Sequence, residues 1–180
     1  SGLSVYNGPF EEFFIRVERI PVPHKDNIEQ VMSKLQHLSE TQDIAAFVYE
    51  PLIQGAAGMK MHDAVHLDRV LAFCKSKSIL CIADEVMTGF GKTGTHFASE
   101  QLSNQPDFIC LSKALSAGML PLALTSCTED IYSAFLSNEL AKGFFHGHTY
   151  SANPLACAVA SAAIDLLNSK SIQNGICLLY

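Results

Sequence analysis

Residues 79–94, ILCIADEVMTGFGKTG, decide the fold. Ile79–Ala83 is an apolar run the length of one strand, and it ends abruptly at the two carboxylates of Asp84 and Glu85. A strand that is apolar without alternation suits a sheet covered on both faces, and such sheets are mostly parallel. Three further runs have the same character: Ile44–Tyr49, Phe108–Leu111 and Leu122–Ser126. We therefore expect an α/β fold with a predominantly parallel sheet flanked by helices.

Helical spacing of apolar residues lies between these runs. The first such set follows Asp26, which with Glu29 predicts a capping box, and consists of Ile28, Val31, Leu35 and Leu38. The second set is Leu67, Val70, Leu71 and Cys74. Pro154 opens an alanine-rich helix that we expect to be buried, and Phe13–Ile20 is predicted as a short strand that ends at Pro21.

The composition excludes several classes of function. The chain has 12 Lys and Arg against 18 Asp and Glu, a net charge of -6, and so lacks the basic surface that nucleic-acid binding requires. No apolar stretch reaches the roughly 18 residues of a membrane span, so no membrane partner is expected. The six cysteines are scattered singly through apolar segments, as buried reduced thiols are, which indicates a reducing, cytoplasmic compartment.

Ionisable residues follow three of the predicted strands: Glu50, Asp84 with Glu85, and Lys113. The carboxyl ends of strands in open α/β sheets form the ligand crevice, so we expect these side chains to converge there. A lysine desolvated in such a cleft has a lowered pKa and can attack an aldehyde, whereas a lysine in solvent would have no such role. Asp84 is either an ordinary ion-pair partner or the carboxylate that keeps a pyridine nitrogen protonated.

The glycines of GFGKTG, residues 89–94, match the dinucleotide-binding fingerprint G-x-G-x-x-G. Two requirements of that fingerprint fail. Residues 84–88 separate the strand from the first glycine, and the next strand ends in Ser112 and Lys113 where an acidic residue should hold the ribose. A nicotinamide-dependent oxidoreductase is therefore a distant alternative.

The tract GFFHGHTYSANP, residues 143–154, is rich in hydrogen-bonding side chains. His146 and His148 flank a glycine, but no third ligand lies at a suitable spacing, so no metal site is expected. Thr149 precedes the helix opened by Pro154 and could donate its hydroxyl and backbone N–H to a phosphate.

Four blocks occur in the order seen in a known family: VYEPLIQGAAG (48–58), IADEVMTGFGKTG (82–94), LSKAL (111–115) and HGHTYSANPLACA (146–158). Together they resemble the class III, fold-type I pyridoxal-phosphate aminotransferases. The similarity runs from about Ser4 to Leu167 and leaves residues 168–180 unassigned. The resemblance implies that residues 1–180 are part of the cofactor-binding large domain, that the upstream portion and the C-terminal small domain are missing, and that this chain alone is inactive.

The resemblance also implies roles for cofactor-binding residues. Lys113 would carry pyridoxal 5'-phosphate as a Schiff base and act as the catalytic residue, Asp84 would hold the pyridine nitrogen, and Val86 would pack against one face of the ring. Thr149 would bind the cofactor phosphate of the opposite subunit, in a homodimer with a shared active site, and His148 is grouped with it as a cofactor-binding residue.

On the substrate side, the resemblance points to Glu50, Gln54 and Lys92, and Lys92 stands where arginine is usual. The combination of EPLIQGAAGMKMH (50–62) with HGHTYSANPLACA is most similar to the branch of the family in biotin biosynthesis. That branch implies small-molecule substrates: 8-amino-7-oxononanoate as amino acceptor and S-adenosylmethionine, or lysine in some relatives, as donor. The alternatives are another ω-aminotransferase, acting on ornithine or 4-aminobutyrate, and a non-catalytic module.

Overall fold

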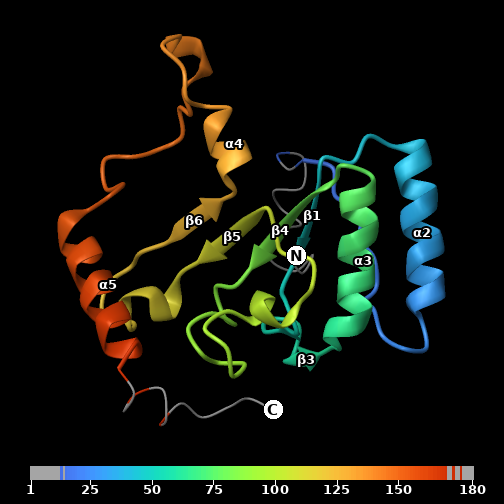
Figure 1. The fold of residues 1–180 in the computed structure, drawn as a ribbon, viewed down its shortest axis with the longest axis horizontal. Helices are drawn as coiled ribbons and strands as arrows, with labels where there is room; N and C mark the ends of the chain where they lie inside the picture. Colours follow the sequence, from blue (N-terminus) through green and yellow to red (C-terminus); the bar gives the residue numbers. More distant parts are fainter. Residues whose placement is uncertain (1–12, 14, 170–171, 173–174, 176–180) are drawn as a thin grey trace.

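The computed structural model describes residues 13, 15–169, 172 and 175. Its centre is a four-stranded sheet in the order β1-β4-β5-β6 (Figure 1). Strands β1 (Ala46–Tyr49), β4 (Leu80–Asp84) and β5 (Phe108–Leu111) are parallel, and β6 (Leu124–Cys127) runs antiparallel to β5. The predicted, predominantly parallel α/β sheet is therefore confirmed, and its three parallel strands end at one edge.

Helices α2 (Ile28–Thr41) and α3 (Ala64–Ser76) lie side by side and cover one face of the sheet (Figure 1). Both predicted apolar sets are buried, with Val31 of α2 and Val70 and Leu71 of α3 fully excluded from solvent. They pack against β1 and β4, where Tyr49, Cys81 and Ala83 are buried. This core fixes β1 and β4, two of the three parallel strands.

The predicted capping box at the start of α2 is wrong. Asn27 occupies the cap position, and its side chain accepts a hydrogen bond from the His24 N–H and donates one to the Val22 carbonyl. Glu29 instead forms a two-pronged ion pair with Arg69 of α3, at 2.6 and 3.0 Å. The carboxylate therefore joins the two helices, because Arg69 offers a charged partner that the helix N-terminus does not.

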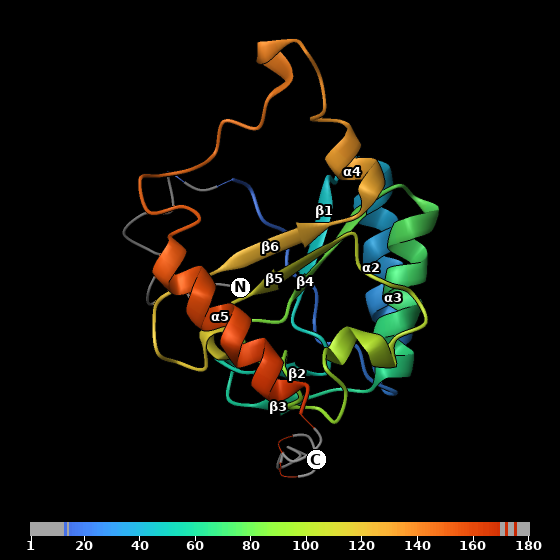
Figure 2. The same cartoon turned by 60° about the vertical axis from the view of Figure 1, so that its left-hand side comes forward.

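Shorter elements complete the chain (Figure 2). Strands β2 (Ile53–Gln54) and β3 (Lys60–Met61) form a small antiparallel hairpin after β1. The remaining elements, in chain order, are η2 (Ala98–Gln101), η3 (Lys113–Ser116), α4 (Glu129–Ser133), η4 (Leu140–Lys142) and α5 (Pro154–Leu167).

Three expectations about burial and pairing fail among the described residues. Residues 15–20 form no strand, because no strand edge pairs with them, and Ile15 is 86% exposed. Helix α5 buries only Ala156 and Ala160, since the neighbour that it contacts most is the short η3. The sheet is covered on one face only, and Val48 of β1 remains 59% exposed.

The segment 128–153, here called the arm, extends away from the sheet between β6 and α5 (Figure 1). Nearly all of it is exposed, including Leu140, Phe144 and Phe145 at 81%, 67% and 75%. Among the described residues, no helix is long and apolar enough to cross a membrane.

The cysteines only partly match the expected pattern of buried thiols. Cys74 and Cys81 are buried, whereas Cys127 and Cys157 are exposed on β6 and α5. Cys177 lies outside the described residues. The five described cysteines are all free thiols.

Candidate functional site

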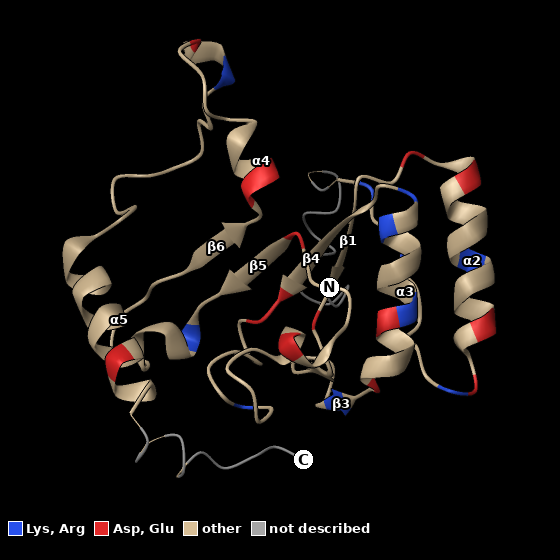
Figure 3. Cartoon of the chain, viewed as in Figure 1, with Lys and Arg blue, Asp and Glu red and all other residues tan. Residues whose placement is uncertain are grey.

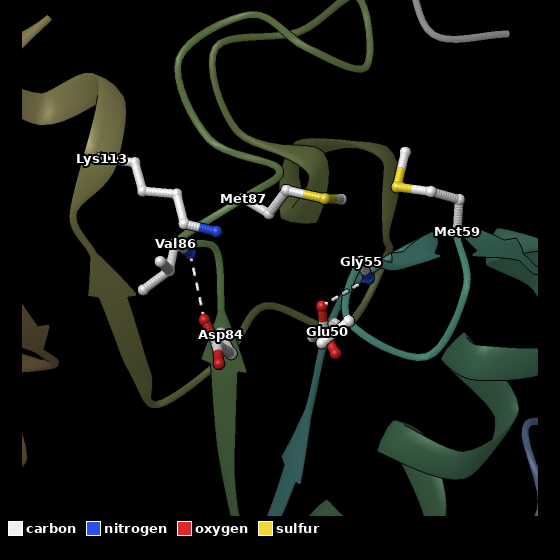
Figure 4. A pocket seen from close by; sticks show the side chains of 8 residues that line it. Glu50, Gly55, Met59, Asp84, Val86, Met87 and Lys113 are labelled. Atoms are coloured by element: carbon white, nitrogen blue, oxygen red, sulfur yellow. Dashed lines mark hydrogen bonds between the residues drawn. The ribbon is translucent and has the colours of Figure 1, made fainter. Parts of the chain in front are cut away.

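A pocket of about 310 Å³ lies at the carboxyl ends of β1, β4 and β5 (Figure 4). Its lining comes from three separate parts of the chain: Glu50, Gly55, Ala56 and Met59 after β1, Asp84, Val86 and Met87 at the end of β4, and Lys113 after β5. The predicted convergence of Glu50, Asp84 and Lys113 is therefore present. It follows from the parallel register, in which β4 pairs with β1 on one side and β5 on the other.

The end of β4 places alternate residues on opposite sides of the chain, as in any strand. Asp84 and Val86 face the pocket, while Glu85 between them is fully buried. The Val86 N–H donates to Asp84 Oδ1 at 3.1 Å. This bond is the only hydrogen bond of the Asp84 carboxylate within the described part of the chain, so its remaining acceptor positions face the pocket.

Lys113 begins η3 with a φ of +43°, in a backbone region that residues other than glycine rarely adopt. The neighbouring Ser112 hydroxyl donates to the Leu122 carbonyl at 2.7 Å and ties this turn to the chain that leads into β6. The Lys113 side chain extends from the turn toward Val86 and Asp84 (Figure 4). The residue is exposed, so the expected desolvation of Lys113 is not provided by the described residues.

Glu50 forms the far wall of the pocket. Its Oε2 accepts a hydrogen bond from the Gly55 N–H at 2.8 Å, which ties the start of the β2–β3 loop to the residue that follows β1. Gly55 also touches Met87, since a Cβ built on Gly55 would lie 2.4 Å from the Met87 sulfur. Met87 and Met59 thus give this wall an apolar, flexible character that the sequence analysis missed (Figure 4).

His62, at the base of the hairpin, lies against the backbone of Glu50. Its Nε2 is 3.1 Å from the Glu50 carbonyl oxygen, and its buried Nδ1 has no partner within the described residues. Burial lowers the pKa of His62 below its usual value, and the contact with the Glu50 carbonyl opposes that shift. The neutral ring is therefore the form that suits this position.

The expectation that Glu85 converges in the crevice with Asp84 is wrong, because the Glu85 side chain is fully buried and does not line the pocket. Its carboxylate accepts four hydrogen bonds, from the Thr88 hydroxyl, the Ala98 N–H, the Ser99 N–H and the Ser99 hydroxyl. The two backbone bonds measure 2.8 and 2.7 Å. The signal that could have predicted this burial is the alternation along β4, which turns one residue of the Asp84-Glu85 pair inward.

The other predicted site residues lie outside the pocket. Gln54 is in β2, half-buried and paired with Lys60, and Lys92 is exposed on the GFGKTG loop. Thr149 and His148 are exposed on the arm, where the His148 N–H donates to the Ser151 hydroxyl. No group of three or more possible metal ligands occurs in the described ranges of the chain.

Charge is distributed unevenly over the molecule (Figure 3). Lys and Arg are interspersed with Asp and Glu along α2 and α3, while β6 and much of the arm carry few charges. The pocket combines two carboxylates, Glu50 and Asp84, with one cation, Lys113. Such a site can hold a polar ligand with a protonated nitrogen near the Asp84 carboxylate and an electrophilic carbon near the Lys113 amine.

Comparisons with known proteins agree with this geometry. The model of the "Aminotransferase class-III" family matches residues 3–177. The chain belongs to the class III aminotransferase family. The family resemblance drawn from the four sequence blocks is thereby confirmed.

Among family members, the adenosylmethionine-8-amino-7-oxononanoate aminotransferase of Synechococcus elongatus is 42% identical over 96% of this chain and 43% of its own length. The crystal structure of the Methanocaldococcus jannaschii enzyme of the same name matches with a TM-score of 0.85 and 31% identity, covering 96% of this chain and 40% of that one. An amine transaminase from an uncultivated Pseudomonas species, solved in its pyridoxal-phosphate-bound form, matches with a TM-score of 0.72 and 35% identity, over 82% and 33%.

The chain thus spans about two fifths of the length of the first two relatives and one third of the third. Their match confirms the fold class, a parallel sheet with flanking helices as in the fold-type I aminotransferases.

Proposed function

We propose that the complete protein containing this chain is a pyridoxal-phosphate-dependent aminotransferase, and that residues 1–180 are part of its cofactor-binding large domain. The observation that carries the proposal is that Lys113 and Asp84 line the same pocket at the carboxyl edge of the sheet. The cofactor, when bound, supplies an electron sink for the bond changes at the substrate carbon.

The pocket residues fit that cofactor. The Asp84 carboxylate has acceptor positions open to the pocket, where it would hold a protonated pyridine nitrogen. Val86 projects from the same side of the chain and would pack against one face of the ring.

Lys113 would hold the cofactor covalently through its amine and then act as general acid and base. Once a donor amine has displaced it, the lysine Nζ would take a proton from the donor carbon and return it to the cofactor. The same steps in reverse would deliver the amino group to the acceptor ketone. Exposure of Lys113 in the described chain leaves room for that displacement.

The substrate that the relatives favour is 8-amino-7-oxononanoate, converted to 7,8-diaminononanoate in biotin biosynthesis, with S-adenosylmethionine as amino donor. Met59 and Met87 suit the aliphatic part of such a substrate, since thioethers adapt to extended apolar chains. Glu50, Gln54 and Lys92 would lie on the substrate side. Lysine as donor, and ornithine or 4-aminobutyrate as substrate, are the alternatives that the experiment below separates.

A homodimer in the cytoplasm completes the proposal. The exposed, weakly charged arm is a surface that a second copy could cover (Figure 3). Thr149 and His148 on the arm would then reach the pocket of the partner subunit, where Thr149 would bind the cofactor phosphate. Cover by the partner would also desolvate Lys113.

The test uses the complete protein loaded with pyridoxal phosphate and a Lys113→Ala variant. We expect the wild type to form 7,8-diaminononanoate from 8-amino-7-oxononanoate with S-adenosylmethionine, and not with lysine, as amino donor. The variant should lose at least about a thousandfold in rate, the scale of general acid–base catalysis. Borohydride reduction should fix the cofactor on the peptide that contains Lys113, as detected by mass spectrometry.

The matched control is Lys77→Ala. Lys77 follows α3 at the amino end of β4, on the opposite edge of the sheet from the pocket, and should leave both readouts unchanged. If product formed only from ornithine or 4-aminobutyrate, the proposed substrate would be wrong. Absence of a reduced adduct on Lys113 would overturn the aminotransferase itself.

A further inference from the structure

Glu85 is a buried carboxylate for which the chemistry proposed above has no use. It has no exposed surface, and its four hydrogen bonds all come from neutral donors. A buried carboxylate is costly unless its charge is satisfied by such donors. A buried carboxylate next to the pocket residues Asp84 and Val86 therefore suggests a role at the pocket.

The donors to Glu85 span the whole GFGKTG loop. Thr88 lies three residues after it, and Ala98 and Ser99 lie thirteen and fourteen residues after it, at the start of η2. The carboxylate thus joins the two ends of the loop that leaves β4 and returns at η2. Its backbone is fixed as well, since the Glu85 N–H donates to the Cys110 carbonyl of β5 and its carbonyl accepts from the Gly89 N–H.

Fixing Glu85 on both its side chain and its backbone fixes the residues on either side of it. Asp84 and Val86 line the pocket on either side of the buried Glu85. The Val86 N–H, immediately after Glu85, is the donor that orients Asp84 Oδ1. Any rotation of the peptide between residues 85 and 86 would move that donor and turn the Asp84 carboxylate.

We propose that Glu85 is a positioning residue for cofactor binding: its buried hydrogen-bond cluster holds the 85–86 backbone so that the Val86 N–H aims the Asp84 carboxylate into the pocket. The proposal rests on the proposed function, because it needs a pyridine nitrogen for Asp84 to meet. It assigns Glu85 no contact with cofactor or substrate.

The chain offers a matched control in Asp68. Its carboxylate on α3 also clamps a loop, accepting from the Ser103 N–H, the Asn104 N–H and the Asn104 side chain, at 3.1, 2.8 and 2.9 Å. Asp68 does not line the pocket. Asp68→Asn should therefore lower stability without changing the position of the Asp84 carboxylate.

The experiment compares Glu85→Gln with Asp68→Asn in the complete protein, stripped of cofactor and titrated with pyridoxal phosphate. We expect Glu85→Gln to weaken cofactor binding by at least about tenfold, since Gln presents an N–H₂ group where two donors now point. The pH at which the absorbance band of the bound cofactor titrates should shift as well, because Asp84 would meet the pyridine nitrogen less directly. Asp68→Asn should lower the melting temperature and leave both quantities unchanged.

Should Glu85→Gln fail to fold, Ser99→Ala and Thr88→Val each remove one donor hydroxyl and keep the carboxylate. Both should weaken binding by about threefold, in the same direction. Equal cofactor affinity and equal band titration in the wild type and the folded variants would overturn the positioning role. A wild-type protein that binds no pyridoxal phosphate would instead overturn the proposed function, so the two failures are distinguishable.

Discussion

Single residues show why part of the site could be predicted from the sequence. Asp84 and Lys113 each follow an apolar run, and the parallel arrangement of those runs brings strand ends together, so their convergence needed only local pattern and topology. The burial of Glu85 and the part of Met87 in the pocket wall were not predicted, because they depend on which side of the turn each residue faces and on partners such as Ser99. Thr149 stays a prediction, because it is exposed on the arm and does not line the pocket of this chain.

The contact between Gly55 and Met87 gives a prediction about the pocket wall. Gly55→Ala would place a methyl group 2.4 Å from the Met87 sulfur, so the thioether must move and the wall be repacked, at a cost of about 1 kcal/mol in unfolding free energy. Met87→Ala alone removes contacts but opens space. In the double variant the methyl group finds that space, so the two costs should be less than additive in urea unfolding of the complete protein. Strict additivity would show that the two side chains do not meet.

At the scale of helices and strands, apolar runs predicted the parallel strands to within two residues, and Phe108–Leu111 was predicted with the bounds of β5. The wrong predictions share one cause: strand pairing and helix burial depend on neighbouring segments, which a local sequence pattern does not specify. Residues 15–20 have strand composition but no strand edge beside them in the described part of the chain. Helix α5 has a small-residue surface but few described neighbours. The antiparallel direction of β6 depends on the connection through η3, which composition does not encode.

The β2–β3 hairpin should carry a pH dependence through His62. Its folded-state pKa is lowered, so on acidification the unfolded chain takes up a proton before the folded chain does. The contribution of the neutral ring is therefore complete above the ordinary histidine pKa of about 6.5 and is lost as pH falls from there through the folded pKa. Unfolding stability measured from pH 8 to 5 should fall in the wild type and fall less in His62→Gln.

The control for this measurement is His24→Gln, since the His24 side chain is 52% exposed before α2. That variant should keep the wild-type pH profile. If His62→Gln also kept it, the hairpin histidine would have no part in the acid sensitivity.

Side-chain burial differs between the two halves of the molecule. The half built on α2, α3, β1 and β4 is well packed, whereas the half from β6 to α5 buries few side chains. Burial in the second half is confined to a few small residues such as Ala156 and Ala160. Because folded proteins rarely leave so much apolar surface uncovered, that half is where we expect self-association.

Phe145→Asp tests this expectation in the complete protein. The ring is 75% exposed on the arm, so a charge there should leave the subunit folded but weaken dimer formation by at least about tenfold, as seen by analytical ultracentrifugation. Val65→Asp on α3, also 75% exposed, is the matched control and should not change the dimer. A Phe145→Asp protein as dimeric as the wild type would place the interface elsewhere.

The backbone at Lys113 has a consequence for how this chain could evolve. A φ of +43° costs a lysine roughly 1–2 kcal/mol that a glycine would avoid, so the fold would gain stability by replacing the residue that we propose as the catalytic lysine. Selection for heat resistance without selection for turnover would therefore favour Lys113→Gly. Stability and the proposed catalytic role would therefore make opposite demands on residue 113. A protein that keeps the lysine must offset its backbone strain by better packing elsewhere.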